Sequence, residues 1–320
     1  MYIRFPIEPK SLPDSWSNWN VYALSWTTTP WSLAANKAIS YRPDTKYCLV
    51  QGQNAEKYIL AEDLLKSNPE LGDIFDSIEV ISSFKGEEIF PNLTYFHPLD
   101  SKSGAKKFFP GSHVNLDSGT GLVHTAPSHG QEDYLLGLEF NLDLSCCVNE
   151  LGKYDETVFD KRLQNLPVLT DGNEKILELL HDQNHILKQT KYQHSYPYDW
   201  RSKKPVILRG SKQWFIDTGS LQKKALEILR NDIKMNSNQG FEKVLQSRPY
   251  WCISRQRVWG VPIPVFYNEN NEAVIDEQIV DKICDKVEME GNVDFWWSLS
   301  EKELLGNHKY IIIYEREDRK

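Results

Sequence analysis

The chain has 320 residues, of which 40% are hydrophobic and 12% aromatic, so it can form one large or two smaller folded domains and is not a disordered chain. No run approaches the ~18 consecutive apolar residues of a membrane span, and Met1–Pro6 has neither secretory nor transit-peptide features. The five cysteines are odd in number and lack CxxC spacing, which argues against a disulfide framework and a zinc site. We therefore expect free thiols, no metal and no membrane contact.

The net charge of −8 is unevenly distributed along the chain. Residues 191–257 hold 14 Lys and Arg against five Asp and Glu, a local balance of +9, and the remainder carries −17. A basic segment on an acidic chain can bind a phosphate backbone. A solvated basic surface gives the same count, so charge alone leaves both readings open.

The first half predicts short strands separated by turn-rich loops, and the second half predicts more helix. The strands expected there are Val21–Trp26, Lys46–Gln51, Lys57–Ala61 and Leu122–Thr125. Apolar spacing predicts a helix over Asn173–Gln189, and a second helix containing Leu221–Leu229 after a cap in Thr218–Ser220. Val261–Tyr267 and Lys309–Tyr314 are predicted as strands.

Two stretches bear on the division into domains. Ser195–Arg209 mixes aromatic residues, prolines and basic charge, which indicates a seam between two units. Glu315–Lys320 is a purely charged run after an apolar strand, which we expect at a chain end rather than inside a completed fold.

A threonine-rich peptide follows the first strand: Trp26-Thr27-Thr28-Thr29-Pro30-Trp31, with Asn36 downstream. Pro30 ends the strand, and alternation predicts that Thr28 points opposite to Thr27 and Thr29. A hydroxyl row beside a turn can hold a water or a ribose. An ordinary β-edge has the same pattern, so the peptide by itself decides little.

A second motif, GTGLVHTAPSHGQEDY, occupies residues 119–134. His124 ends a strand, and we expect Ser128 or His129 to open a helix that places His129 and Asp133 on one face. His124 and Asp133 can then look into one cleft, where a carboxylate suits an ammonium group. A lone histidine is more often structural, and a metal pair of His129 and Asp133 lacks an evident third ligand.

A third motif, RPYWCISRQRVWGVP, occupies residues 248–262. It places Arg255 and Arg257 between Trp251 and Trp259, where arginine can bind phosphate or stack on the aromatic rings. A buried aromatic packing motif fits equally well.

Together these motifs resemble one family. The order WTTTPW with Asn36, GTGLVHTAPSHGQEDY, SYPYDWRSKKPVI, QWF and WCISRQRVWG is similar to isoleucyl-tRNA synthetase, a class I enzyme, over roughly residues 20–265. The leucine and valine enzymes typically carry an Arg inside the threonine-rich peptide and lack the HTAP run. The combination of WTTTPW and HTAP is therefore specific to the isoleucine enzyme. The sequences of these motifs are most similar to those of the bacterial or mitochondrial type, and Trp296–Leu299 is similar to the mitochondrial form.

The resemblance implies roles for individual residues in an editing site. Thr27, Thr28 and Thr29 match the peptide that holds the water and the terminal ribose, and His124 matches the residue that blocks the larger isoleucine side chain. Asp133 matches the carboxylate that binds the α-ammonium of the misplaced amino acid. The residues assigned to binding or supporting the substrate are Trp26, Asn36, His129 and Tyr134. Those assigned to tRNA are Arg201, Lys203, Lys204, Lys212, Arg255 and Arg257. Ser32 and Ala34 stand where the family usually has Thr and Pro, and Ser128 where Gly or Ala is common.

The activation chemistry of this family is not visible in the sequence. Neither the HIGH-type nor the KMSKS-type motif is found, and Asp100–Ser103 resembles the second only superficially. We therefore expect hydrolysis of Val-tRNA(Ile) without a cofactor, and ATP use only by a full-length enzyme. The expected partner is isoleucine tRNA mischarged with valine, and we expect a monomer. The alternatives are a non-catalytic tRNA-binding fragment and a free-standing protein that edits in trans.

The resemblance implies an α+β fold. We expect a β-barrel-like editing domain over residues 1–195, inserted in a Rossmann-like synthetase. A connecting segment over 196–247 and a partial catalytic or connective segment over 248–320 complete the expected organisation. The expected location is the mitochondrial matrix, with the bacterial cytoplasm as the alternative.

Overall fold

The computed structural model describes residues 1–52, 55–75, 78–234, 239–247, 250–255, 260–268, 270 and 272–305. The chain divides into two compact units, Met1–Ser211 and Lys212–Lys320. In the described part of the chain, no helix is long and apolar enough to cross a membrane. The expectation of three segments, 1–195, 196–247 and 248–320, remains a prediction.

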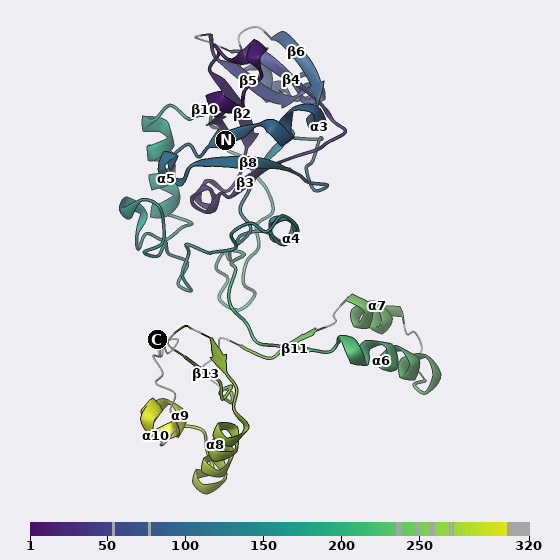
Figure 1. Ribbon diagram of the computed structural model, residues 1–320, viewed down its shortest axis with the longest axis vertical. Coiled ribbons are helices and arrows are strands. Elements are labelled where there is room, and N and C mark those ends of the chain that lie inside the picture. Colours follow the sequence, from purple (N-terminus) through teal and green to yellow (C-terminus); the bar gives the residue numbers. More distant parts are fainter. Residues whose placement is uncertain are drawn as a thin grey trace. The chain divides into compact units, whose positions relative to one another are not determined.

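Unit 1 contains two sheets (Figure 1). The larger sheet has the strand order β10-β1-β2-β5-β4-β6, and the smaller one has the order β7-β8-β3-β9. The strands of the larger sheet are β1 (Tyr2–Pro6), β2 (Val21–Trp26), β4 (Lys46–Gln51), β5 (Lys57–Ala61), β6 (Glu79–Lys85) and β10 (Ile186–Lys188). Those of the smaller sheet are β3 (Ala38–Tyr41), β7 (Thr94–Phe96), β8 (Ala105–Pro110) and β9 (Leu122–Thr125).

Helices and short turns connect these strands. The α-helices of unit 1 are α1 (Glu62–Ser67), α2 (Pro69–Gly72), α3 (Gly86–Ile89), α4 (Gln131–Glu139) and α5 (Asp171–Asp182). A 3-10 helix, η3 (Pro30–Ala35), leads from β2 toward β3. The core between them is rich in aromatic rings; the fully buried ones include Tyr2, Phe5, Tyr47, Phe90, Tyr95 and Tyr154.

The expected α+β class is confirmed, but the expected barrel-like shape is wrong. Each sheet of the described unit 1 is open, with β10 and β6 as the edges of one and β7 and β9 as the edges of the other. The sheets are joined locally: Ser25 in β2 donates its hydroxyl to Leu122 O in β9 at 3.0 Å. This contact holds the peptide that follows β2 close to the strand that carries His124.

Four predicted strands are confirmed with their bounds, and the predicted helix over Asn173–Gln189 is too long. Helix α5 ends at Asp182, and Asn184 adopts a left-handed backbone with φ 56°. This turn reverses the chain, so that Ile186 pairs with Ile3 of β1 in strand β10. The apolar spacing of Ile186 and Leu187 therefore belongs to a sheet edge rather than to the helix.

Unit 2 has its own small core of Phe266, Ile279, Ile283, Phe295, Leu304 and Leu305. Its helices are α6 (Gly219–Asn231), α7 (Gln239–Ser247), α8 (Glu277–Glu290), α9 (Phe295–Ser298) and α10 (Glu301–Leu305). Its strands form two antiparallel pairs, β11 (Phe215–Asp217) with β12 (Tyr250–Cys252), and β13 (Phe266–Tyr267) with β14 (Ala273–Val274).

The predictions for unit 2 have different outcomes in the structure. The strand predicted over Val261–Tyr267 is limited to Phe266–Tyr267, because only these residues find a partner strand in the described part of the chain. The strand predicted over Lys309–Tyr314 lies outside the described residues, and so does the run Glu315–Lys320. The helix predicted after Thr218 is present as α6, although the Thr218 side chain makes no capping hydrogen bond.

Candidate functional site

The threonine-rich peptide forms a hydrogen-bonded turn at the end of β2. Thr29 N–H donates to Thr27 Oγ1 at 3.1 Å, and the two hydroxyl oxygens lie 3.4 Å apart. Thr28 is exposed. The predicted alternation is therefore confirmed: Thr27 and Thr29 present a hydroxyl pair, and Thr28 does not join it.

His124 lies opposite this peptide on β9. It pairs with Ile39 of the antiparallel strand β3, and only 8% of its surface is exposed. Its Nε2 is 3.0 Å from Ser32 Oγ, and its Nδ1 is 3.0 Å from Asn36 Nδ2. Both ring nitrogens are thus occupied by side chains of the segment that follows the threonines.

The orientation of Asn36 determines the tautomer of His124. Asn36 Nδ2 donates to Ala38 O at 2.9 Å, and Asn36 Oδ1 accepts from the hydroxyl of buried Tyr95 at 2.7 Å. A flipped amide would place its oxygen against a carbonyl oxygen, so the second Nδ2 hydrogen points at His124 Nδ1. Nδ1 therefore accepts, and Nε2 carries the proton and donates to Ser32 Oγ.

Electrostatics keep this imidazole uncharged. Burial, reinforced by His129 and Lys106, lowers the pKa of His124 to about 3. A neutral ring whose basic nitrogen already accepts a hydrogen bond is poorly suited to take a proton from water. It is well suited to act as a fixed wall.

Ser32 links His124 to the threonines, and the sequence analysis treated it only as a departure from the family pattern. Its hydroxyl donates to Thr29 O at 2.8 Å and lies 3.2 Å from Thr29 Oγ1. Pro30 starts the 3-10 helix η3, and the three-residue repeat of that helix brings Ser32 back over Thr29. The sequence feature that could have indicated this contact is Pro30, which starts a turn directly after the threonines.

Distant segments hold the same peptide in place. Trp31 N–H donates to Asn173 Oδ1 of α5 at 3.2 Å, and Tyr154 OH donates to Trp31 O at 2.7 Å. Tyr95 holds Asn36 from β7. None of these partners was predicted from sequence, because nothing local marks them.

Asp133 lies in the first turn of α4, beside the end of β9. Its Oδ2 accepts from Ala126 N–H at 2.8 Å, and its Oδ1 is 3.8 Å from His113 Nε2. Burial raises the pKa of this carboxyl, while the Ala126 N–H and His113 lower it. Asp133 is thus a largely buried acid whose carboxyl is hydrogen-bonded to the residue directly after the strand that carries His124.

The helix predicted to start at Ser128 or His129 starts later, at Gln131, because Gly130 is extended with φ −155°. His129 and Asp133 therefore do not share a helical face, which corrects that prediction. His129 Nδ1 donates to Leu208 O at 3.0 Å, and its ring meets Trp31 edge-on at 4.8 Å. His129 thus holds the loop, while Tyr134 is 44% exposed.

Trp26 and Arg201 pack against aromatic rings. Trp26 is half-buried and packs edge-on against Tyr192 at 5.1 Å. Arg201 stacks over Trp200 at 4.7 Å. The exposed residues of the predicted tRNA-binding set are Arg201, Lys203, Lys204, Lys212 and Arg255.

Of the two arginines of the third motif, the structure describes Arg255 and not Arg257. Arg255 Nη1 donates to the carbonyls of Cys252 and Ser254, each at 2.7 Å, so part of its guanidinium holds its own backbone. Arg257 lies outside the described residues.

Comparisons with known proteins agree with the motif pattern. The family model described as tRNA synthetases class I (I, L, M and V) matches residues 21–318. The mitochondrial isoleucine–tRNA ligase of Macaca fascicularis is 41% identical over 314 residues, covering 95% of this chain and 31% of that protein. The isoleucine–tRNA ligase of Microcystis aeruginosa is 38% identical over 310 residues, covering 95% and 32%.

Among solved structures, the cytosolic leucyl-tRNA synthetase editing domain of P. falciparum aligns with a TM-score of 0.42 and 11% identity, covering 58% of this chain and 98% of that one. The chain spans about a third of the length of the curated relatives that it matches. A family model that matches nearly the whole chain, and relatives at about 40% identity, show that the chain belongs to the class I tRNA synthetases, with isoleucine–tRNA ligases among its relatives.

Proposed function

We propose that this chain carries a post-transfer editing site that hydrolyses valine from Val-tRNA(Ile). The observation that carries the proposal is the continuous hydrogen-bonded network of Thr27, Thr29, Ser32, His124 and Asn36. It combines a pair of threonine hydroxyls with a rigid neutral ring. These are the groups needed to hold a water and to limit the size of a side chain.

The need for such a site follows from the limits of selectivity. A hydrophobic pocket separates substrates that differ by one methylene by only ~1–3 kcal/mol, or about 10–200-fold, and isoleucine against valine is the established example of this limit. A second site that admits only the smaller product raises the fidelity. The aminoacyl ester is already activated, so the site has to place a water, bind the ammonium and stabilise an oxyanion.

In the proposed reaction, Thr27 and Thr29 hold the terminal ribose and the attacking water. The water oxygen bonds to the ester carbonyl carbon, the bond to the ribose oxygen breaks, and the ribose oxygen gains the proton that water loses. Asp133 binds the α-ammonium group as a carboxylate. His124 stands where the extra methylene of isoleucine would lie, so the correct product is excluded.

The position of Asp133 supports its part in this scheme. Its carboxyl accepts from the Ala126 N–H, two residues beyond His124 and directly after the end of β9, and no Lys or Arg forms an ion pair with it within the described residues. An ammonium group is the natural partner of a buried carboxylate in this position.

The remaining roles are proposed on family membership. Isoleucine tRNA is the proposed partner, the exposed basic residues near Arg201 and Lys204 are its proposed contacts, and a monomer is the proposed state. ATP use belongs to the full-length enzyme. The proposed location is the mitochondrial matrix, which the mitochondrial enzymes among its relatives support, with a bacterial cytoplasm as the alternative.

The decisive experiment measures release of labelled amino acid from Val-tRNA(Ile) and Ile-tRNA(Ile) by the purified chain. We expect fast release of valine and slow release of isoleucine. Binding of both tRNAs without release of either would favour the alternative of a non-catalytic tRNA-binding fragment. Activity of the separate chain in the presence of an editing-deficient full-length enzyme would show that it can act in trans.

A further inference from the structure

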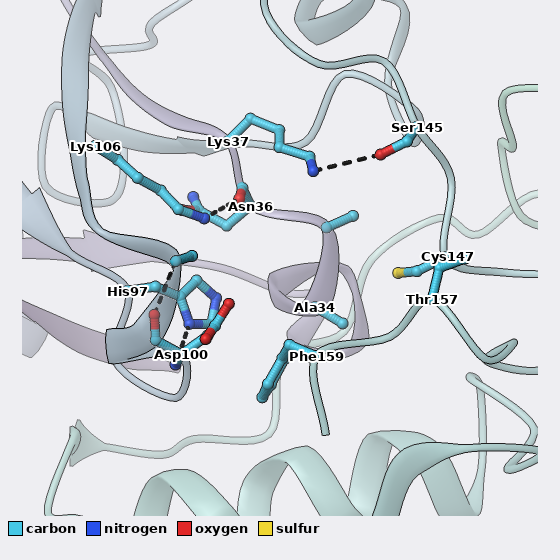
Figure 2. Close-up of a pocket in the computed structure, with 12 residues that line it drawn as sticks. Ala34, Asn36, Lys37, His97, Asp100, Lys106, Ser145, Cys147, Thr157 and Phe159 are labelled. Atoms are coloured by element: carbon cyan, nitrogen blue, oxygen red, sulfur yellow. Dashed lines mark hydrogen bonds between the residues drawn. The ribbon is translucent and has the colours of Figure 1, made fainter. Parts of the chain in front are cut away.

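A cavity of about 160 Å³ lies in unit 1 next to Asn36 (Figure 2). Thr27, Thr28 and Thr29 are not among the residues that line it. Among the predicted site residues, only Asn36 lines it. Three parts of the chain enclose it: the end of η3 with the two residues that precede β3, the loop that leads into β8 together with β8, and the segment between Ser145 and Phe159. By volume it has room for about five water molecules.

Two charges of opposite sign face this cavity without pairing. The Lys106 ammonium is largely buried and donates to Asn36 O at 2.5 Å. The Asp100 side chain comes from the loop before β8. Neither residue takes part in an ion pair within the described part of the chain. The ammonium has three N–H donors, so two remain for a ligand.

The other polar groups of the wall are already engaged. Lys37 forms an ion pair with Asp143 at 2.5 Å. His97 Nδ1 accepts from the backbone N–H groups of Leu99 and Asp100, its Nε2 donates to Leu33 O at 2.8 Å, and burial lowers its pKa to about 3. Burial likewise raises the pKa of Cys147 to about 12, which keeps it a neutral thiol.

The charge balance decides what kind of ligand fits. With Lys37 paired and His97 neutral, the cavity wall presents one positive and one negative group. A simple anion would gain Lys106 but be buried near Asp100, and a simple cation would meet the reverse problem. A molecule that carries both charges satisfies both groups.

We propose that this cavity binds a small free α-amino acid, with its carboxylate on Lys106 and its ammonium toward Asp100. The methyl group of Ala34 and the ring of Phe159 then receive the side chain. A bound carboxylate would stabilise the charged form of Lys106, whose pKa burial and Lys37 lower to about 8. The site goes beyond the proposed hydrolysis and does not depend on it.

Asn36 connects the cavity to the editing network. Asn36 receives the Lys106 N–H at its backbone oxygen and gives its side-chain N–H to His124. Because both contacts meet at Asn36, an amino acid on Lys106 would act one residue away from the wall of the editing site.

The test is calorimetric titration of the full chain with glycine, alanine and valine, and with acetate and methylammonium as ligands that carry one charge. We expect saturable binding of the amino acids and at least tenfold weaker binding of the other two. Lys106→Met and Asp100→Asn should each weaken amino-acid binding at least tenfold. Lys107→Met, which changes the exposed neighbour on β8, should leave it unchanged.

Further variants separate this site from the editing site. Valine can also bind as a product at Asp133, so the titration is repeated with Asp133→Asn; retained binding there locates the amino acid in the cavity. Loss of amino-acid binding in Asp133→Asn with no effect of Asp100→Asn would overturn the inference, as would acetate binding as tightly as glycine. Asp100 is half-buried in a loop, so Asp100→Asn keeps the test valid even where Lys106→Met unfolds the chain.

Discussion

Asn36 Nδ2 donates to Nδ1 of His124 across 3.0 Å, and this single contact determines which nitrogen of the ring carries the proton. The same amide is held by Ala38 O and Tyr95 OH, so it cannot turn without losing two other hydrogen bonds. The imidazole is therefore held neutral and oriented. This geometry favours His124 as a steric wall over His124 as a general base.

We predict that His124→Ala makes the site hydrolyse Ile-tRNA(Ile) as well as Val-tRNA(Ile). Removing the ring opens more space than one methylene needs, while the hydroxyl pair of Thr27 and Thr29 and the carboxylate of Asp133 remain. The discrimination between the two substrates should fall by about 10–200-fold, the value of one methylene. Deacylation rates on both charged tRNAs provide the measurement, and a mutant that is inactive on both would show that His124 acts chemically.

We predict that Asp133→Asn lowers kcat/KM for Val-tRNA(Ile) by at least about 100-fold. The substitution keeps an acceptor for Ala126 N–H but removes the charge that binds the ammonium, and loss of one partner of a buried ion pair costs ~3–5 kcal/mol. Glu132→Gln, which changes the exposed neighbouring acid, is the matched control and should be neutral. Near-normal deacylation by Asp133→Asn would exclude this role.

Ser32→Ala should loosen both the wall and the threonine turn. It removes the acceptor of His124 Nε2–H and the donor to Thr29 O, and a buried polar group left without a partner costs ~1–3 kcal/mol. We expect a loss of unfolding free energy of that size together with more hydrolysis of Ile-tRNA(Ile). Ser32→Thr keeps the hydroxyl and should preserve selectivity; equal behaviour of the two variants would remove Ser32 from the network.

The pH dependence of stability should reveal that His97 and His124 are neutral in the folded protein. Burial lowers the pKa of both His97 and His124 to about 3, whereas both titrate near 6.5 in the unfolded chain. Between about pH 6.5 and 3 the unfolded state binds more protons, so the unfolding free energy falls as the pH falls, by up to about 1.4 kcal/mol per pH unit for each histidine. Above that window their contribution is constant.

Urea denaturation at about pH 7.5 and pH 5 measures this slope. In the neutral variant His124→Gln, the slope of unfolding free energy against pH should be shallower by the contribution of one histidine. An unchanged slope in that variant would mean that His124 is protonated in the folded state, contrary to its hydrogen bonds.

We predict that Arg201→Ala combined with Lys204→Ala weakens tRNA binding most at low salt. Each lost phosphate contact lowers the slope of log affinity against log salt by about 1, so the pair should lower it by up to about 2. Lys102→Ala with Lys107→Ala removes the same charge from exposed positions near β8 and is the control. Identical salt titrations for both double variants would exclude a specific role for the 201–204 segment.

The sequence predicted the strands better than the ends of the helix. β2, β4, β5 and β9 are short apolar runs bounded by turn residues, a pattern that favours a strand at that length. Ile186 and Leu187 were assigned to a helix because they continue its spacing, although Asn184 turns the chain there. A residue that leaves the helix in a left-handed conformation is not visible in the apolar spacing.

The candidate site was predictable only where one motif contained it. The threonines and His124 lie in recognisable motifs and come together in the fold. Tyr95, Tyr154 and Asn173 hold the same peptide from distant parts of the chain, and no local pattern distinguishes them from ordinary core and surface residues. Long-range partners of this kind follow from the fold and not from spacing.

The hydrogen bonds from Tyr154 and Asn173 to the backbone of Trp31 also set the order in which the site can form during synthesis. The two residues whose side chains bind the Trp31 backbone, Tyr154 and Asn173, lie 123 and 142 positions further along the chain. At ~5–20 residues per second, they leave the ribosome on the order of ten seconds after the threonine peptide. In a nascent chain, β1, β2, β4 and β5 can already pair while the peptide still lacks its fixed shape, so the geometry of the candidate site is completed late, when α5 docks.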